Sequence, residues 1–277
     1  MGAIIWLASY PKSGNTWMRV FLHNLLLNPA EPVSINSATR FCVGESAASH
    51  FNQFDPRPLS QLTDQEIAQL RPKVQEHLTR YFPDSVFVKT HNYLAEHEGF
   101  PLISLQYTAG AIYMIRNPLD VAISFAGHYG LEIEEAIEQM GHAGIGTPTT
   151  DRNAQQVYGT WSLNVQSWTQ HSLPALHVVR YEDMAHRSLK TFAGVAKFLG
   201  LNPPSKRLKR AIRNSSFDIL KAQEDEHGFD ESTEHSRFFR EGRAGQWKEA
   251  LSEQQVRRVV SDHREQMERF GYVPDGY

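Results

Sequence analysis

Residues 9–17, Ser-Tyr-Pro-Lys-Ser-Gly-Asn-Thr-Trp, carry side chains that suit a phosphate group. Lys12 offers a positive charge, and Ser13 and Thr16 offer hydroxyl donors. Gly14 has no side chain, so the backbone can approach a ligand closely there. These residue types predict an anion-binding turn, although a polar turn of this kind can equally be structural.

The elements on either side of this turn are predicted to position it. An apolar run at residues 3–8 is typical of a buried parallel strand, and apolar side chains recur at helical spacing from Trp17 to Leu25. A helix that begins near Gly14 or Asn15 presents unpaired N–H groups and a partial positive charge to an anion. The turn is not a standard P-loop, because its lysine precedes the glycine.

A second cluster follows a predicted strand at residues 111–115. Arg116 comes at the end of that strand, and Ser124 lies less than two turns into a helix that begins with Pro118 and Asp120. A guanidinium and a hydroxyl so placed can hold one phosphate from two sides. Either residue alone is equally typical of a surface charge or a helix filler.

Together the two motifs resemble those of the sulfotransferases that use 3′-phosphoadenosine 5′-phosphosulfate (PAPS). Residues 9–17 resemble the loop that binds the phosphosulfate, where a threonine is usual at the position of Asn15. The pattern Arg-Asn-Pro-x-Asp-x-x-x-Ser at residues 116–124 is similar to the site of the 3′-phosphate. The resemblance implies a cytosolic-type enzyme, similar to small-molecule sulfotransferases of bacteria, with PAPS as co-substrate and adenosine 3′,5′-bisphosphate as product.

Three shorter segments resemble further parts of that family's site. Lys-Thr-His at residues 89–91 is similar to the strand end that presents the catalytic histidine. Tyr-Glu-Asp-Met at residues 181–184 and Ser-Ser-Phe at residues 215–217 resemble segments around the adenine. The implied residues around the adenine are Trp17, Tyr181, Ser215 and Phe217.

Residues 239–248 resemble the family's segment that closes over the 3′-phosphate, which implies roles for Arg240 and Gly242. Glu241 stands where a lysine is common, and we expect it to face solvent or to pair with Arg243. The implied catalytic residues are His91, Lys12 and Ser124. The implied cofactor-binding residues are Lys12, Ser13, Gly14, Asn15, Thr16, Trp17, Arg116, Ser124, Tyr181, Ser215, Phe217, Arg240 and Gly242.

The resemblance also implies a mechanism in which the acceptor oxygen displaces the adenosine bisphosphate in line. His91 would be the general base, and Lys12 would neutralise charge on the leaving oxygen. Ser124 would hold the 3′-phosphate and engage Lys12 before the acceptor arrives. No metal ligand set is recognised in the sequence, and none is expected.

Two further apolar runs, residues 85–89 and 176–180, also end in polar clusters. Four strands separated by helical segments predict an α/β fold with a central parallel sheet flanked by helices and a P-loop-like nucleotide site. A single domain over residues 1–277 is expected.

Other segments give more local predictions. Capping boxes at Thr63 and Ser252 begin two helices, and the second is expected to end at Gly271. Pro72 is expected to start a further helix or to bend the first. Residues 141–156 are predicted to form a mobile lid, and residues 222–236 a solvated loop.

Composition limits the partners. With 277 residues and a net charge of -3, a broad nucleic-acid-binding surface is not expected. No apolar run has the length of a membrane span, and Cys42, the single cysteine, is expected in the core. Cleavage of a signal peptide would destroy the loop that begins at Ser9, so a cytoplasmic location is expected. A homodimer is possible, although the short dimer motif of some relatives has no convincing copy.

The expected acceptor is a small molecule with a hydroxyl group, and a phenol, an alcohol, a sugar, a carrier-bound intermediate and an amine all stay open. A P-loop-like nucleotide kinase is an alternative, against which the early Lys12 and the Arg116/Ser124 pair count. A catalytically inactive nucleotide-binding protein is another, against which the presence of both Lys12 and His91 counts.

Overall fold

The computed structural model describes residues 2–37, 41–170, 173–235 and 237–277. The chain forms two compact units, each assembled from three stretches of sequence. The first unit comprises Met1–Tyr10, Cys42–Tyr113 and Gln139–Val178, and the second comprises Pro11–Phe41, Met114–Glu138 and Val179–Tyr277. A single domain over residues 1–277 stays a prediction.

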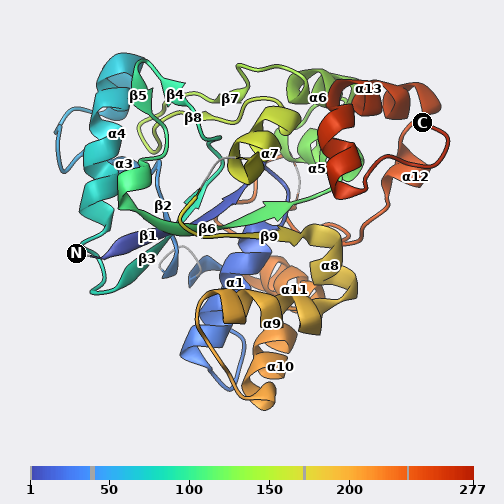
Figure 1. Ribbon diagram of the computed structural model, residues 1–277, viewed down its shortest axis with the longest axis horizontal. Coiled ribbons are helices and arrows are strands. Elements are labelled where there is room, and N and C mark those ends of the chain that lie inside the picture. Colours follow the sequence, from blue (N-terminus) through green and yellow to red (C-terminus); the bar gives the residue numbers. More distant parts are fainter. Residues whose placement is uncertain (1, 38–40, 171–172, 236) are drawn as a thin grey trace. The chain divides into compact units, whose positions relative to one another are not determined.

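A five-stranded sheet has the order β2-β3-β1-β6-β9 (Figure 1). Strands β1 and β3 run parallel, with Ala3 opposite Ser85 and Ala8 opposite Thr90. The predicted α/β fold with a central parallel sheet flanked by helices is confirmed. The five strands are β1 (Ala3–Ser9), β2 (Val43–Gly44), β3 (Ser85–Thr90), β6 (Thr108–Ile115) and β9 (Leu176–Arg180).

The first unit adds several helices and two small antiparallel hairpins. Its remaining elements are α3 (Ala48–Phe51), η2 (Leu59–Gln61), α4 (Asp64–Leu78), β4 (Glu96–His97), β5 (Phe100–Pro101), η3 (Leu105–Tyr107), β7 (Gly146–Thr147), β8 (Gln156–Val157) and α7 (Trp161–Gln170). Strands β7 and β8 pair across most of the predicted lid at residues 141–156, whose mobility stays a prediction.

Helix α4 begins at the predicted capping box, in which Thr63 and Glu66 exchange hydrogen bonds. Pro72 lies inside this helix, and no second helix starts there. Proline removes one backbone donor. The buried side chains of Ile67, Val74 and Leu78 offset that loss by packing on either side of it.

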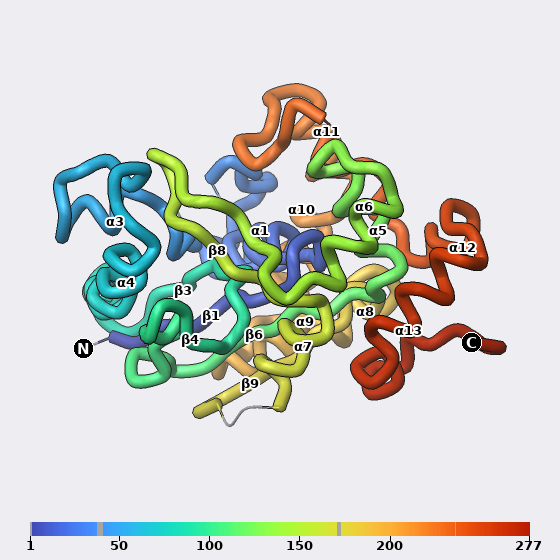
Figure 2. The backbone as a smooth tube through the Cα atoms, turned by 90° about the horizontal axis from the view of Figure 1, so that it is seen from above, coloured from blue at the N-terminus to red at the C-terminus, as the bar shows by residue number. Residues whose placement is uncertain are grey.

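The second unit is mainly helical, and α12 and α13 follow one another towards the carboxyl terminus (Figure 2). Helix α13 begins at the predicted capping box of Ser252 and ends at Gly271, which has a left-handed conformation. The elements are α1 (Asn15–Leu27), η1 (Ile35–Ser37), α5 (Pro118–Tyr129), α8 (Tyr181–His186), α9 (Ser188–Phe198), α10 (Ser205–Asn214), α11 (Phe217–His227), α12 (Trp247–Ala250) and α13 (Glu253–Phe270). Helix α6 (Ile133–Met140) contains residues of both units.

The prediction of a solvated loop over residues 222–236 is wrong for its first six residues, which belong to α11. Leu220 and Glu224 of this helix are buried. The Glu224 carboxylate accepts hydrogen bonds from the backbone N–H groups of Phe238 and Phe239, at 2.6 and 2.8 Å. A carboxylate that looks solvated in the sequence thus organises the chain that follows. Ser236 lies outside the described residues.

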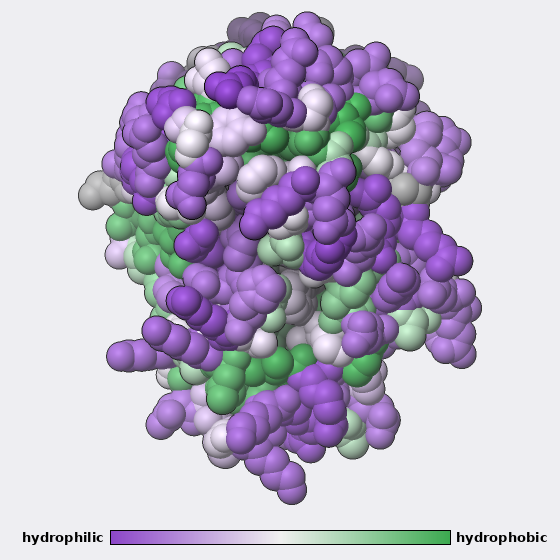
Figure 3. Space-filling model, turned by 90° about the vertical axis from the view of Figure 1, so that its right-hand side faces the viewer, coloured by the Kyte–Doolittle hydropathy of each residue, from purple (hydrophilic) through white to green (hydrophobic). Residues whose placement is uncertain are grey.

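Large apolar side chains, among them Trp6, Trp161 and Trp168, are fully buried, and Cys42 is buried as predicted. On the face drawn in Figure 3, hydrophilic residues predominate and hydrophobic ones form smaller groups. Within the described ranges, no helix is long and apolar enough to cross a membrane. The same ranges hold no group of three or more histidines, cysteines and carboxylates placed to bind a metal ion.

Candidate active site

The loop between β1 and α1 has an unusual backbone. Lys12 has a φ of 65° and Gly14 a φ of 95°, so two of its residues adopt left-handed conformations. A Cβ atom on Gly14 would lie 2.7 Å from Met184 Cε and 2.9 Å from Tyr181 Cδ2. Glycine is therefore required here both for its backbone conformation and for the close approach of α8. Strain at Lys12 is of the kind found where a side chain must be aimed at a ligand.

The start of α1 gathers polar side chains. The Ser13 hydroxyl is buried and has no hydrogen-bond partner among the described residues. Thr16 Oγ1 donates to the Glu231 carboxylate at 3.1 Å, and Arg19 Nη2 pairs with the same oxygen at 2.6 Å. A buried hydroxyl without a partner beside a helix N-terminus is suited to donate to an anion.

Arg116 lies behind the loop. Its Nη1 donates to the Lys12 carbonyl at 3.0 Å, and its guanidinium carbon lies 4.2 Å from the centroid of the Tyr181 ring. Its Nε is buried and has no partner in the described part of the chain. The structure thus brings together the predicted residues Lys12, Arg116 and Tyr181. It leaves the Nε–H group of Arg116 as a strong donor for a ligand.

Arg240 lies along α5. Its Nη2 donates to the Ile123 carbonyl at 3.2 Å, and its guanidinium packs against Gly127. These contacts place Arg240 on the turn of α5 that carries Ser124. The predicted pair of Glu241 and Arg243 is confirmed, at 3.2 Å.

Asp120 joins the two segments that the sequence assigned to the 3′-phosphate. Its buried carboxylate accepts hydrogen bonds from the backbone N–H groups of Gly245 and Trp247, at 2.6 and 3.1 Å. Sequence reasoning used Asp120 only as a first-turn residue of α5. Its position in the Arg-Asn-Pro-x-Asp motif is the feature of the sequence that could have indicated a role beyond the first turn of α5.

The aromatic residues predicted around the adenine divide into two groups. The Trp17 and Tyr181 rings meet edge to face, with centroids 5.7 Å apart. Phe217 packs against Gly242, where a Cβ atom would lie 2.2 Å from its ring. Trp17 and Phe217 both pack against one apolar cluster, which comprises Val20, Ile35, Leu220, Phe229 and Phe239. The hydroxyl of Ser215 donates to the Ala211 carbonyl at 2.9 Å, back into its own helix.

His91, in the first unit, is oriented by the end of β1. Its Nδ1 lies 2.8 Å from the Ser9 carbonyl oxygen and 3.2 Å from Ser9 Oγ. A carbonyl can only accept, so Nδ1 carries the proton of the neutral imidazole and Nε2 carries the lone pair. This tautomer is the one that a base acting through Nε2 requires.

The backbone of His91 is held as well. Asn164 Nδ2 donates to the His91 carbonyl at 3.0 Å, while Asn164 Oδ1 accepts from the buried Tyr113 hydroxyl at 2.8 Å. The Tyr158 ring meets the imidazole edge on, with centroids 6.0 Å apart. Ser9 and Tyr158 therefore contact the imidazole itself, while Asn164 holds the backbone that carries it.

A buried carboxylate supports both neighbours of His91. Glu45 accepts hydrogen bonds from the Thr90 hydroxyl and from Asn92 Nδ2, the latter at 2.5 Å. Arg71 Nη1 lies 3.5 Å from the same carboxylate. Burial raises the pKa of Glu45, against the opposing effects of Arg71 and the donors. Sequence reasoning missed Glu45, because nothing near it in the chain indicates its partners.

The sequence-predicted residues fall into two sets. The second unit carries Lys12, Ser13, Gly14, Asn15, Thr16, Trp17, Arg116, Ser124, Tyr181, Ser215, Phe217, Arg240 and Gly242. His91 belongs to the first unit, together with the end of β1 that orients it. The parallel sheet, the strand–loop–helix turn and the arginine behind it define an α/β protein of the P-loop-like nucleotide-binding type.

Comparison with known proteins narrows this class. The sulfotransferase domain family matches residues 4–271, so the chain belongs to that family. Sulfotransferase 1A1 of Canis lupus familiaris is 25% identical over 282 residues, which cover 96% of this chain and 83% of that protein. The 3-alpha-hydroxysteroid sulfotransferase of Cavia porcellus is 23% identical over 280 residues, with coverage of 96% and 83%.

Two solved structures share the fold. Retinol dehydratase in a complex with retinol and PAP has a TM-score of 0.65 at 20% identity, covering 95% of this chain and 81% of that chain. Mouse sulfotransferase SULT7A1 complexed with PAP has a TM-score of 0.60 at 22% identity, covering 96% and 84%. Membership of the family supports sulfuryl transfer as the reaction and does not favour the kinase or the inactive nucleotide-binding protein.

Proposed function

We propose that the protein transfers a sulfuryl group from PAPS to a hydroxyl group of a small molecule, with His91 as general base. One observation carries the proposal. The Ser9 carbonyl, at the end of β1, fixes the His91 tautomer that keeps the proton on Nδ1 and the lone pair on Nε2. An imidazole held in this tautomer is suited to accept the proton of the acceptor hydroxyl through Nε2.

The nucleotide would be held by the second unit. Lys12, Ser13 and the N–H groups at the start of α1 suit the 5′-phosphosulfate, with Gly14, Asn15 and Thr16 completing the loop. Arg116, Ser124 and Arg240 suit the 3′-phosphate. The unpartnered Nε of Arg116 supports this assignment, because a buried guanidinium nitrogen needs an acceptor. PAP in two structures of the same fold supports PAPS as the co-substrate.

The adenine would lie among Trp17, Tyr181 and Phe217, with Gly242 giving Phe217 its close packing. Ser215 would contribute its backbone or the lone pairs of its hydroxyl, because the hydroxyl proton is already donated to Ala211. Aromatic side chains that share one apolar cluster are suited to stack on a base.

In the reaction, the acceptor oxygen attacks the sulfur while the bond from sulfur to the phosphate oxygen breaks. The acceptor proton passes to His91 Nε2, and the leaving phosphate oxygen gains the negative charge. Lys12 and the loop N–H groups neutralise that charge, while Ser124 binds the 3′-phosphate and engages Lys12 before the acceptor arrives. Histidine is the side chain that most often takes up a proton as a general base in catalysis.

The acceptor class is proposed from relatives. The relative from Cavia porcellus is named for a hydroxysteroid, and the retinol dehydratase structure contains retinol. Both compounds carry a hydroxyl group. A cytoplasmic location and the oligomeric state stay predictions.

The test is a transfer assay in which PAPS is incubated with a panel of phenols, alcohols, sugars and amines, and sulfated products are read by mass spectrometry. The His91→Ala variant should lose turnover at least about 100-fold, while calorimetry with adenosine 3′,5′-bisphosphate gives wild-type affinity. Wild-type turnover in His91→Ala would refute the base. Tight binding of ATP with magnesium and none of adenosine 3′,5′-bisphosphate would refute the nucleotide assignment.

A further inference from the structure

Helix α10 has an unusual charge. Its sequence, Ser-Lys-Arg-Leu-Lys-Arg-Ala-Ile-Arg-Asn, holds five cationic residues and no acidic one, in a chain whose net charge is -3. Helix α13 of the same unit is also rich in arginine, but there Arg257 pairs with Glu253 and Arg258 with Asp262. The positive charge of α10 is not balanced within the helix.

Two of the five cations have a structural role. Arg207 Nε and Nη2 donate to the Leu25 and Leu26 carbonyls at 2.8 and 3.0 Å. Arg210 Nη2 donates to the Asn28 carbonyl at 3.1 Å. Leu25 and Leu26 lie in the last turn of α1 and Asn28 is its C-cap, where the helix dipole is negative, so both guanidinium groups stabilise the end of that helix.

The other three, Lys206, Lys209 and Arg213, are exposed. Within the described residues, no carboxylate pairs with any of them, and Arg213 has only a 3.5 Å contact to Asn214 Oδ1. They are three, four and seven residues apart in sequence, so their backbone positions lie on one side of the helix. Like charges so arranged repel one another unless an anion lies between them.

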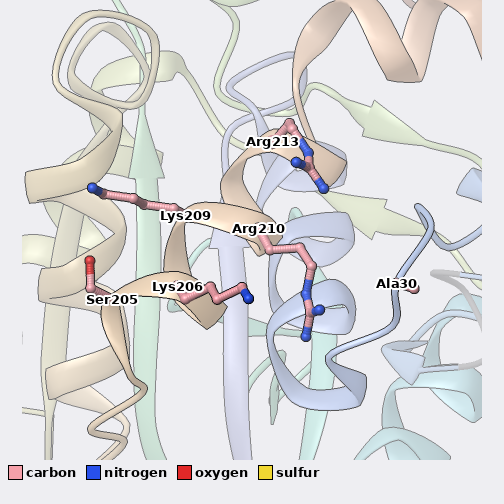
Figure 4. A pocket seen from close by; sticks show the side chains of 6 residues that line it. All are labelled: Ala30, Ser205, Lys206, Lys209, Arg210 and Arg213. Atoms are coloured by element: carbon pink, nitrogen blue, oxygen red, sulfur yellow. The ribbon is translucent and has the colours of Figure 1, made fainter.

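A pocket of about 730 Å³ lies over this part of α10. Its lining residues are Ala30, Ser205, Lys206, Lys209, Arg210 and Arg213. Figure 4 shows Lys206 and Arg210 extending towards the same side, while Lys209 extends away from them. Arg210 Nε is buried there and has no partner among the described residues. The lining thus has four cations, a hydroxyl at the first turn of α10 and no carboxylate.

We propose that this pocket binds a ligand carrying several phosphate groups, either a free oligophosphate or the headgroup of an anionic lipid. Several cations without counterions match a ligand of several negative charges better than one phosphate. A hollow of this size admits more than an inorganic ion. None of the lining residues belongs to the proposed nucleotide site, so the two sites can be tested separately.

The test compares two double variants of equal charge. Lys206→Gln/Arg213→Gln removes two exposed cations of the pocket, and Lys190→Gln/Lys197→Gln removes two exposed cations of the neighbouring helix α9. Inorganic tripolyphosphate is titrated calorimetrically into each full-length protein saturated with adenosine 3′,5′-bisphosphate. We expect at least 10-fold weaker binding for the pocket variant and less than 2-fold change for the α9 variant.

A flotation assay distinguishes the two sources. Vesicles of phosphatidylcholine with an anionic phospholipid are compared with phosphatidylcholine alone. If the wild-type protein floats with the anionic vesicles but not with phosphatidylcholine vesicles, and the pocket variant floats with neither, the ligand is the headgroup of an anionic lipid. Tripolyphosphate binding without flotation supports the free ligand. The proposal would be overturned if tripolyphosphate binding were weakened equally in both double variants. It would also be overturned if the wild-type protein, saturated with adenosine 3′,5′-bisphosphate, bound no tripolyphosphate.

Discussion

The ammonium group of Lys12 lies 3.7 Å from the centroid of the Phe238 ring. Lys12 belongs to the loop before α1, whereas Phe238 belongs to the segment that follows α11. A cation over an aromatic face is attracted by the ring quadrupole, and the contact is stronger where water is excluded. The aromatic segment therefore orients the lysine that the sequence assigns to the leaving group.

Loss of this ring should reduce turnover. Replacement of Phe238 by Leu removes the quadrupole, and we expect a cost of about 0.5–2 kcal/mol, which corresponds to about 2- to 30-fold in turnover. Phe238→Tyr keeps the ring and serves as the control. Initial rates with PAPS provide the measurement. Identical rates for the Leu and Tyr variants would show that the contact with Lys12 does not matter for the reaction.

Glu231 places a negative charge where the nucleotide loop offers donors. Its carboxylate accepts from Thr16 Oγ1 at 3.1 Å and pairs with the buried Arg19 at 2.6 Å. Glu231→Gln should strengthen the binding of adenosine 3′,5′-bisphosphate, because Thr16 and Arg19 become available to the phosphate. It should also lower the free energy of unfolding by up to about 3 kcal/mol, because Arg19 loses its counterion.

The control for Glu231→Gln is Glu234→Gln, which changes the same charge in an exposed side chain that contacts only His235 among the described ion pairs. Calorimetry gives the nucleotide affinity, and urea unfolding gives the stability. If Glu231→Gln binds the nucleotide more weakly than Glu234→Gln does, the carboxylate supports the loop instead of competing with the phosphate.

The sequence alone predicts some features of the site and not others. The strand–loop–helix turn and the two capping boxes were predictable, because each depends on residues a few positions apart. The role of Glu45 was not, because its partners Thr90 and Asn92 are 45 and 47 residues away. Glu231 lies 215 residues from Thr16 and gave no local signal.

That residues 222–227 are helical could not be predicted from the sequence, for a related reason. The segment is acidic and polar, and polar residues on a helix are indistinguishable from a loop until their partners are known. The buried Glu224 meets Phe238 and Phe239 only once the chain has turned back on itself. Propensity and periodicity describe neighbours along the chain, so tertiary partners of charged residues escape them.

Glu45 should affect turnover and leave nucleotide affinity unchanged. Glu45→Gln keeps the shape but weakens the acceptor for Thr90 and Asn92, which flank His91. We expect about 10-fold lower turnover, since one charge-assisted hydrogen bond is worth about 1.5 kcal/mol. Unchanged calorimetric affinity for adenosine 3′,5′-bisphosphate separates this effect from unfolding. Equal losses of turnover and of nucleotide affinity would assign Glu45 a purely structural role.

His263 should make stability depend on pH. It is buried in α13, and burial lowers its pKa from 6.5 to about 4. Above pH 6.5 both folded and unfolded chains carry it neutral, so its contribution to stability is fully present. Between pH 6.5 and 4 the unfolded chain takes up a proton that the folded chain excludes, so stability falls as the pH falls. The loss by pH 4 is on the order of 3 kcal/mol.

Urea unfolding at several pH values between 7 and 4.5 measures this loss. His263→Gln is neutral throughout, so its stability should fall less steeply with falling pH than that of the wild type. His227→Gln, at an exposed position on α11, should retain the wild-type dependence. If His263→Gln and the wild type lose stability in parallel, the buried imidazole is protonated in the folded state at the same pH as in the unfolded chain. The environment of α13 would then have to stabilise its charge.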